Sequence, residues 1–277
     1  MHSKKGNNST ERYYLSLFLH SLSFFVLSYL IIYVVSGIST LYIAYDMDIP
    51  ARLFPSEIRF GMADESPLWT FDAIVSVYMA APFASLAVGV AGLAVYQFVR
   101  RVSVPFLFIV IWLFLHAFNQ TFGLVSEDLI TQTGLTRVAK TMGIDDFLLV
   151  LTIGISLFFL FKSGLFAARL FYLHTPEKFI ENRQNRIKLL MFSFYLPWLV
   201  GTAVIQGIAW PGIKAKDVIL ALFMLFILLC MLLVKPSARA DKSTYNKPPG
   251  WQNIFFPVFT AVALWSFMLL LKGGIGY

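Results

Sequence analysis

The chain has 277 residues, of which 58% are hydrophobic and only 13% are charged, and its mean hydropathy is +0.73. A water-soluble domain carries roughly 25% charged residues, so this composition excludes an ordinary soluble protein and indicates that much of the surface faces lipid. The net charge of +7 falls mainly in short loops between apolar runs, where membrane topology and anionic lipid headgroups explain it. We find no nucleic-acid-binding signature and expect no nucleic-acid partner.

Continuous apolar runs predict an all-α fold, a polytopic transmembrane bundle of about seven helices. Roughly 18 or more apolar residues cross the hydrocarbon core as a helix, and these runs lack the alternation that is typical of barrel strands. In chain order the predicted spans are 15–41, 68–98, 104–124, 146–171, 189–209, 217–234 and 253–271. We expect a cytoplasmic N-terminal tail at 1–13 and a single transmembrane helical domain at 14–277.

The connections between these spans are short. The longest outer segment, 43–67, contains two prolines and is expected to hold an interfacial helix at Ser56–Met62. Trp210-Pro211-Gly212 is a tight reversal signal that predicts an antiparallel hairpin of the fifth and sixth spans. Residues 235–252, rich in Lys, Ser and Pro, are expected to form a flexible connector.

The distribution of lysine and arginine predicts the orientation. With the N-terminus in the cytoplasm, the inner side receives 13 basic residues: Lys4, Lys5, Arg12, Arg100, Arg101, Lys178, Arg183, Arg186, Lys188, Lys235, Arg239, Lys242 and Lys247. The outer side receives seven: Arg52, Arg59, Arg137, Lys140, Lys214, Lys216 and Lys272. This positive-inside bias predicts a cytoplasmic N-terminus and a C-terminus outside. The basic inner loops and the short connectors favour a bacterial inner (plasma) membrane.

The third predicted span carries the most distinctive polar residues. His116, Asn119, Gln120 and Gly123 are spaced at i, i+3, i+4 and i+7, which places them on one face of a helix. Polar side chains at such depth face the bundle interior or a water-filled cavity. This face is interpreted as interhelical hydrogen bonding, as a substrate, ion or proton site, or as a metal or cofactor ligand set. Asp72, near the outer end of the second span, is expected to reach the depth of Gln120 and to join that site.

Two further patterns bear on a transport path. Glu127 and Asp128 leave the third span and Asp145-Asp146 enter the fourth, so adjoining helices would form an acidic vestibule, although helix capping also explains Asp145-Asp146. The fifth span carries Pro197 together with Thr202 and Gln206. A proline kink in a polar span is compatible with a transport site and with an ordinary span.

The remaining motifs are negative. The single cysteine, Cys230, allows no intrachain disulfide or cysteine metal cluster, and the sequence suggests no cofactor and no metal site. Zincin, serine-hydrolase, Walker A and dinucleotide-binding motifs do not occur in the sequence.

The sequence favours a non-catalytic subunit or scaffold of a larger membrane complex, whose partners are the lipid bilayer and other membrane subunits or further copies of itself. The alternative is a small transporter or channel-like protein with an outward-facing polar path around His116. A membrane-embedded enzyme with a dispersed site is the third hypothesis.

Overall fold

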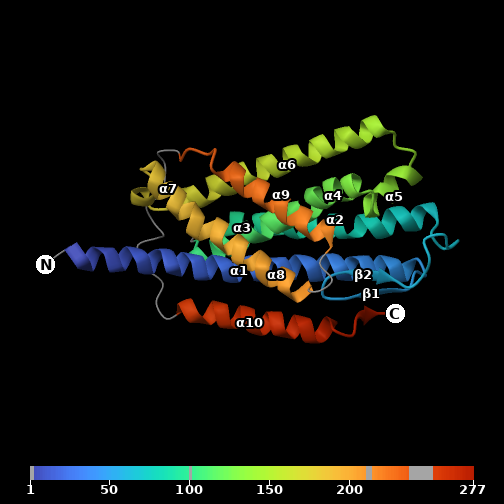
Figure 1. Ribbon diagram of the computed structural model, residues 1–277, viewed down its shortest axis with the longest axis horizontal. Coiled ribbons are helices and arrows are strands. Elements are labelled where there is room, and N and C mark those ends of the chain that lie inside the picture. Colours follow the sequence, from blue (N-terminus) through green and yellow to red (C-terminus); the bar gives the residue numbers. More distant parts are fainter. Residues whose placement is uncertain (1–2, 100–101, 210–213, 237–251) are drawn as a thin grey trace.

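The computed structural model describes residues 3–99, 102–209, 214–236 and 252–277, and these are predominantly helical. The long helices are α1 (Ser3–Asp46), α2 (Phe71–Phe98), α3 (Val104–Phe118), α6 (Asp146–Leu173), α8 (Leu196–Ala209), α9 (Ala215–Met231) and α10 (Gln252–Leu271). The shorter segments are the π-helical η1 (Asn119–Gly123) and η3 (Met191–Tyr195), the 3-10 helix η2 (Glu177–Phe179), and α4 (Leu124–Thr131), α5 (Gly134–Thr141) and α7 (Arg183–Leu190). Figure 1 shows the long helices gathered around the long axis of the molecule.

Six helical segments of the described chain are long and apolar enough to cross a membrane, which confirms the prediction of a helical membrane protein. They are Glu11–Asp46, Phe71–Phe98, Val104–Thr131, Asp146–Leu173, Arg183–Ile208 and Ile254–Leu271. The third runs through α3, η1 and α4, and the fifth through α7, η3 and α8. Helix α9 has 17 residues, or about 25 Å at roughly 1.5 Å per residue, and it is slightly shorter than these six.

Some predicted features lie outside the described residues. These are the reversal at Trp210-Pro211-Gly212, the inner-loop residues Arg100 and Arg101, and most of the connector at 235–252. The expected tail at 1–13 overlaps α1, which is already helical at Ser3.

A small antiparallel sheet lies at the end of the bundle where α1 terminates (Figure 1). Its strands are β1 (Ala51–Leu53), β2 (Ile58–Phe60) and β3 (Ile275–Gly276), in the order β2-β1-β3. The predicted interfacial helix at Ser56–Met62 is therefore wrong. The residues from Ile58 to Phe60 alternate apolar and charged side chains, a period of two that suits a strand, and Leu53 pairs with Ile58 across the hairpin.

Helix α1 is the central element of the bundle. It packs against α2, α3, α8 and α10, whereas α6 packs chiefly against α9. The core where these helices meet is aromatic: Phe25 of α1 lies edge-on to Trp112 of α3, with ring centroids 4.8 Å apart. Trp112 also packs against Phe194 of η3, at 5.3 Å.

Polar contacts within this core join three helices at a proline. Pro197 in α8 has no N–H, so it cannot donate to the carbonyl of Ser193 four residues earlier. The hydroxyl of Ser21 in α1 donates to that carbonyl instead. Trp112 Nε1 in turn donates to Ser21 Oγ at 2.8 Å. The carbonyl that Pro197 leaves without a donor is thus bonded by α1, and α3 supports that bond through Trp112, which fixes the position of α8 relative to both.

Candidate functional site: a polar cavity within the bundle

A cavity of about 150 Å³ lies between α1, α3, η1, α8 and α9. Its aromatic wall consists of Phe25, Tyr29, Tyr33, Trp198 and Phe267, and its polar wall includes Ser56, His116, Asn119, Gln120, Thr202 and Gln206. In another protein, a cavity of about this volume binds a benzene molecule. The cavity therefore has room for a ligand with roughly six non-hydrogen atoms.

The order of residues along the helices gives the cavity a deep end and a mouth. The deep end is formed by Phe25, His116 and Trp198, and the ring centroids of Phe25 and His116 lie 4.6 Å apart. The mouth is formed by the loop between β1 and β2 and by the first turn of α9, which contributes Lys216 and Asp217. Polarity thus increases from an aromatic floor toward a charged opening.

Asn119 and Gln120 reach the cavity from η1, a π-helical turn within the third span. Such turns are rare and occur frequently at functional sites. The side-chain amide of Asn119 donates to the carbonyl of Leu220 in α9, with an N···O distance of 3.0 Å. A Cβ atom at Gly123 would lie only 2.5 Å from Asn119 Oδ1, so a glycine there leaves room for the carboxamide.

Four polar atoms of the cavity-lining residues are buried without a hydrogen-bond partner among the described residues. They are His116 Nε2, Asn119 Oδ1, Trp198 Nε1 and Gln206 Oε1. Each such atom costs about 1–3 kcal/mol unless it is paired. The set combines the indole donor of Trp198 with the amide acceptors of Asn119 and Gln206, so it can bind a ligand that both donates and accepts hydrogen bonds.

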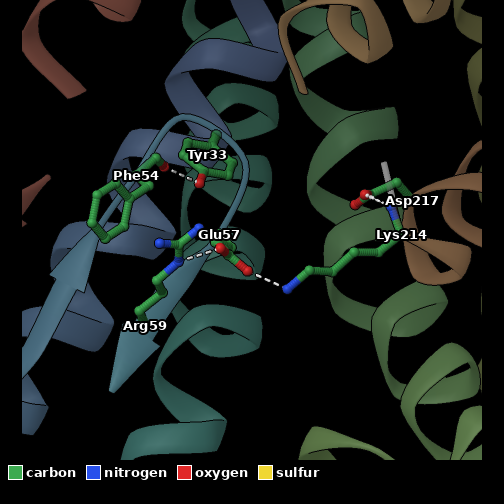
Figure 2. Close-up of polar contacts among 6 residues, drawn as sticks. All are labelled: Tyr33, Phe54, Glu57, Arg59, Lys214 and Asp217. Carbon is green, nitrogen blue, oxygen red and sulfur yellow. Dashed lines mark hydrogen bonds and ion pairs between the residues drawn. The ribbon is translucent and has the colours of Figure 1, made fainter. Parts of the chain in front are cut away.

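The mouth is closed on one side by an ion-pair bridge (Figure 2). Glu57, in the loop between β1 and β2, accepts hydrogen bonds from Arg59 Nε and from Lys214 Nζ at the start of α9. The hydroxyl of Tyr33 donates to the carbonyl of Phe54 in the same loop. These contacts hold the loop over the cavity, and Pro55 and Ser56 at its tip line the opening.

The charge state of Glu57 follows from these neighbours. Burial alone raises the pKa of its carboxyl, but the hydrogen bonds and positive charges of Lys214 and Arg59 outweigh burial and hold that pKa below its ordinary value. Glu57 is therefore ionised at neutral pH, and the bridge is a charged one. Its carboxylate is mostly covered, at 12% exposure, whereas Arg59 and Lys214 are more than half exposed.

Three of the four residues predicted to form a site meet at the cavity, and one does not. His116, Asn119 and Gln120 line it. Asp72 is exposed in the first turn of α2, where Thr70 caps the helix, and it lies outside the set of lining residues. A carboxylate in that position suits the partial positive charge of a helix N-terminus.

Two of the four acidic residues of the expected vestibule cap helices in the described chain. Asp128 accepts hydrogen bonds from Thr133 Oγ1 and from the backbone N–H of Leu135, and so caps α5. Asp145 accepts from the N–H of Leu148 and caps α6, as the capping interpretation predicted. Neither residue lines the cavity, whose charged lining residues, Lys216 and Asp217, come from α9 instead.

Sequence reasoning missed several residues of this site. Trp198, Lys216 and Asp217 were not singled out, because each lies near the end of an apolar run or inside one and belongs to no motif. Thr202 and Gln206 were noted only as polar residues near Pro197. Their four-residue spacing was the available signal, since it places both on one face of α8.

Comparison with known proteins gives no further guidance, since no protein-family model, no curated protein and no solved structure matches the chain.

Proposed function

We propose that this chain is a seven-span integral membrane protein that binds a small polar solute within its bundle and moves it across the membrane. The observation that carries the proposal is the gathering of four unpartnered polar atoms on residues that line one cavity. A purely structural set of polar residues would be expected to pair with one another, because an unsatisfied polar group inside a membrane protein is expensive.

The seven-span topology adds α9 to the six segments of sufficient length. Helix α9 packs against α6, α4 and η1, so it belongs to the bundle. Its 17 residues, which include Lys216 and Asp217 in the first turn, are at the lower limit of length for a span. The positive-inside bias supports an N-terminus in the cytoplasm and a cavity mouth outside, and an odd number of spans would then leave the C-terminus outside. The proposed location is a bacterial plasma membrane.

Cysteine accessibility tests whether the cavity opens to the outside. Cys230→Ser removes the single native cysteine, and Thr202→Cys then places one thiol on the cavity wall. A membrane-impermeant methanethiosulfonate added outside intact cells is expected to modify this thiol. The matched control is Ala168→Cys, a fully buried site in α6 away from the cavity, which is expected to stay unmodified. Equal modification of both positions, or of neither, would contradict the proposal.

A second proposal, a subunit of a larger membrane complex, is supported by α10. Among the helices that the structure describes, α10 makes its extensive contacts with α1. Its other face exposes large apolar side chains such as Phe259 and Trp265, which is 68% exposed. Co-purification from the native membrane in mild detergent separates the two proposals. A stoichiometric partner would favour the subunit, whereas a monomer or homo-oligomer that takes up solute in reconstituted vesicles would favour transport.

A further inference from the structure

The charged groups that line the cavity are one cation and one anion on adjacent residues. Lys216 and Asp217 occupy the first turn of α9, and every other described lining residue is neutral or histidine. Among the described residues neither one forms a salt bridge. The neighbouring Lys214 differs, because its ammonium is bound to Glu57 and it does not line the cavity.

Asp217 is held in place by a local hydrogen bond. One of its carboxylate oxygens accepts the backbone N–H of Lys214 at 2.9 Å. Tyr29 and Tyr33 of α1 line the same cavity.

A ligand with a single charge fits this mouth poorly. An anion would pair with Lys216 and leave Asp217 beside a second negative charge, and a cation would do the reverse. Removing a charge from water without a partner costs several kcal/mol. A ligand with both charges compensates both groups at once, while its body reaches the neutral donors and acceptors below.

We propose that the solute of this cavity is a small zwitterion, whose anionic group binds the ammonium of Lys216 and whose cationic group binds the carboxylate of Asp217. Tyr29 and Tyr33 line the same cavity, and an aromatic ring face that a cationic group can reach favours an ammonium group. The cavity volume of about 150 Å³ restricts the ligand to the size of a small amino acid or a related amino carboxylate. This inference rests on the proposed function and specifies its substrate class.

The test compares probes of similar size that differ in charge. Alanine and γ-aminobutyrate are zwitterions with close and distant charges, butyrate is an anion, butylamine a cation and butyramide is neutral. Binding to the full-length protein in detergent is measured by isothermal titration calorimetry. At least one zwitterion is expected to bind about tenfold or more tightly than the three other probes, since loss of one partner of a desolvated charge pair weakens binding by at least that factor.

Two substitutions should change which charge type of probe binds most tightly. Lys216→Gln is expected to favour butylamine over the zwitterions, because only Asp217 remains charged. Asp217→Asn is expected to favour butyrate, while its amide oxygen can still accept the N–H of Lys214. The control, Lys140→Gln in α5, removes an exposed lysine that does not line the cavity and should leave the ranking of probes unchanged.

Each outcome decides the question. Equal binding of butyramide and the zwitterions by the unmodified chain would overturn the proposal. Tightest binding of butylamine would also overturn it and would identify a cation site dominated by Asp217. Absence of binding by every probe, with Thr202→Cys still modified from outside, would overturn the zwitterion alone. If Thr202→Cys is also unreactive, the proposed function fails as well.

Discussion

Replacing Gly164 of α6 by alanine is expected to destabilise the bundle, because the backbone of α9 lies too close there to leave room for a Cβ atom. A Cβ atom at this position would collide with the carbonyl oxygen of Ile227 and lie 2.9 Å from the Cβ atom of Cys230, whereas ordinary contact begins at 3.4 Å. The backbone of α9 cannot rotate away as a side chain can. The helices must therefore separate by at least about 0.5 Å, the difference between these two distances.

A matched substitution on the same helix isolates the energetic cost of the clash at Gly164. Gly154→Ala meets no atom within 4 Å, so it gains only the helix propensity of alanine, about 1 kcal/mol. Gly164→Ala gains the same amount but adds an overpacking cost of about 1–3 kcal/mol. The difference between the two variants is the cost of the clash.

Thermal unfolding in detergent, followed by circular dichroism, measures that difference. For chains somewhat smaller than this one, about 1 kcal/mol shifts Tm by roughly 2–4 °C, so Gly164→Ala should melt on the order of 5 °C below Gly154→Ala. If Gly164→Ala melts at or above the temperature of Gly154→Ala, α6 and α9 do not approach as closely as described.

The remaining predictions concern the buried serines, the charged bridge and the cavity wall. Ser21→Ala should lower the free energy of unfolding by about 1–3 kcal/mol, since it leaves Trp112 Nε1 and the Ser193 carbonyl without their hydrogen-bond partner. Ser28→Ala, seven residues further along α1, removes a buried hydroxyl without a described partner and should be neutral or stabilising in the same melting assay. If the two variants lose the same stability, the hydrogen bonds of the Ser21 hydroxyl do not contribute as described. Glu57→Gln should cost about 0.5–1 kcal/mol at pH 7, because both cationic partners are solvent-exposed. Since folding lowers the pKa of Glu57, this stabilisation is present above the ordinary pKa of 4.5 and is lost as pH falls through the lower folded value, so the Tm difference from the unmodified chain should vanish in strong acid. Gly201→Ala would place its Cβ atom 2.6 Å from Cε1 of Phe25. It should push this ring toward His116 and weaken solute binding in calorimetry. Gly207→Ala meets no atom within 4 Å and should leave binding unchanged.

The sequence predicted the helices well, because a span of hydrocarbon requires a long apolar run and leaves few alternatives. It also identified the His116 face, since three polar side chains on one side of an apolar helix must point to the protein interior. The π-helical turn that carries Asn119 and Gln120 was not predicted. Such a turn depends on how the segment packs against α2, where Thr121 Oγ1 donates to the Pro82 carbonyl, and this contact has no signature in the local sequence.

The mouth of the cavity could not be predicted because it depends on long-range contacts. Glu57 and Lys214 are separated by 157 positions in the chain, and neither residue is unusual where it stands. The position of Asp72 was uncertain for a related reason: spacing gives the depth of a residue along its helix, but not the direction in which the helix turns it. Asp72 was predicted to reach the depth of Gln120, and it lies on an exposed face of α2.

The length of α1 has a mechanical consequence. Its 44 residues extend for about 66 Å at roughly 1.5 Å per residue, about twice the thickness of the hydrocarbon core. Tyr29, near the middle, lines the cavity, and the far end of the helix leads directly into the hairpin that covers the mouth. A helix neither stretches nor bends easily, so a tilt of α1 would be transmitted along its length. A tilt of about 5° around Tyr29 would displace the far end, about 25 Å away at roughly 1.5 Å per residue, by about 2 Å, and the loop that carries Glu57 would move with it.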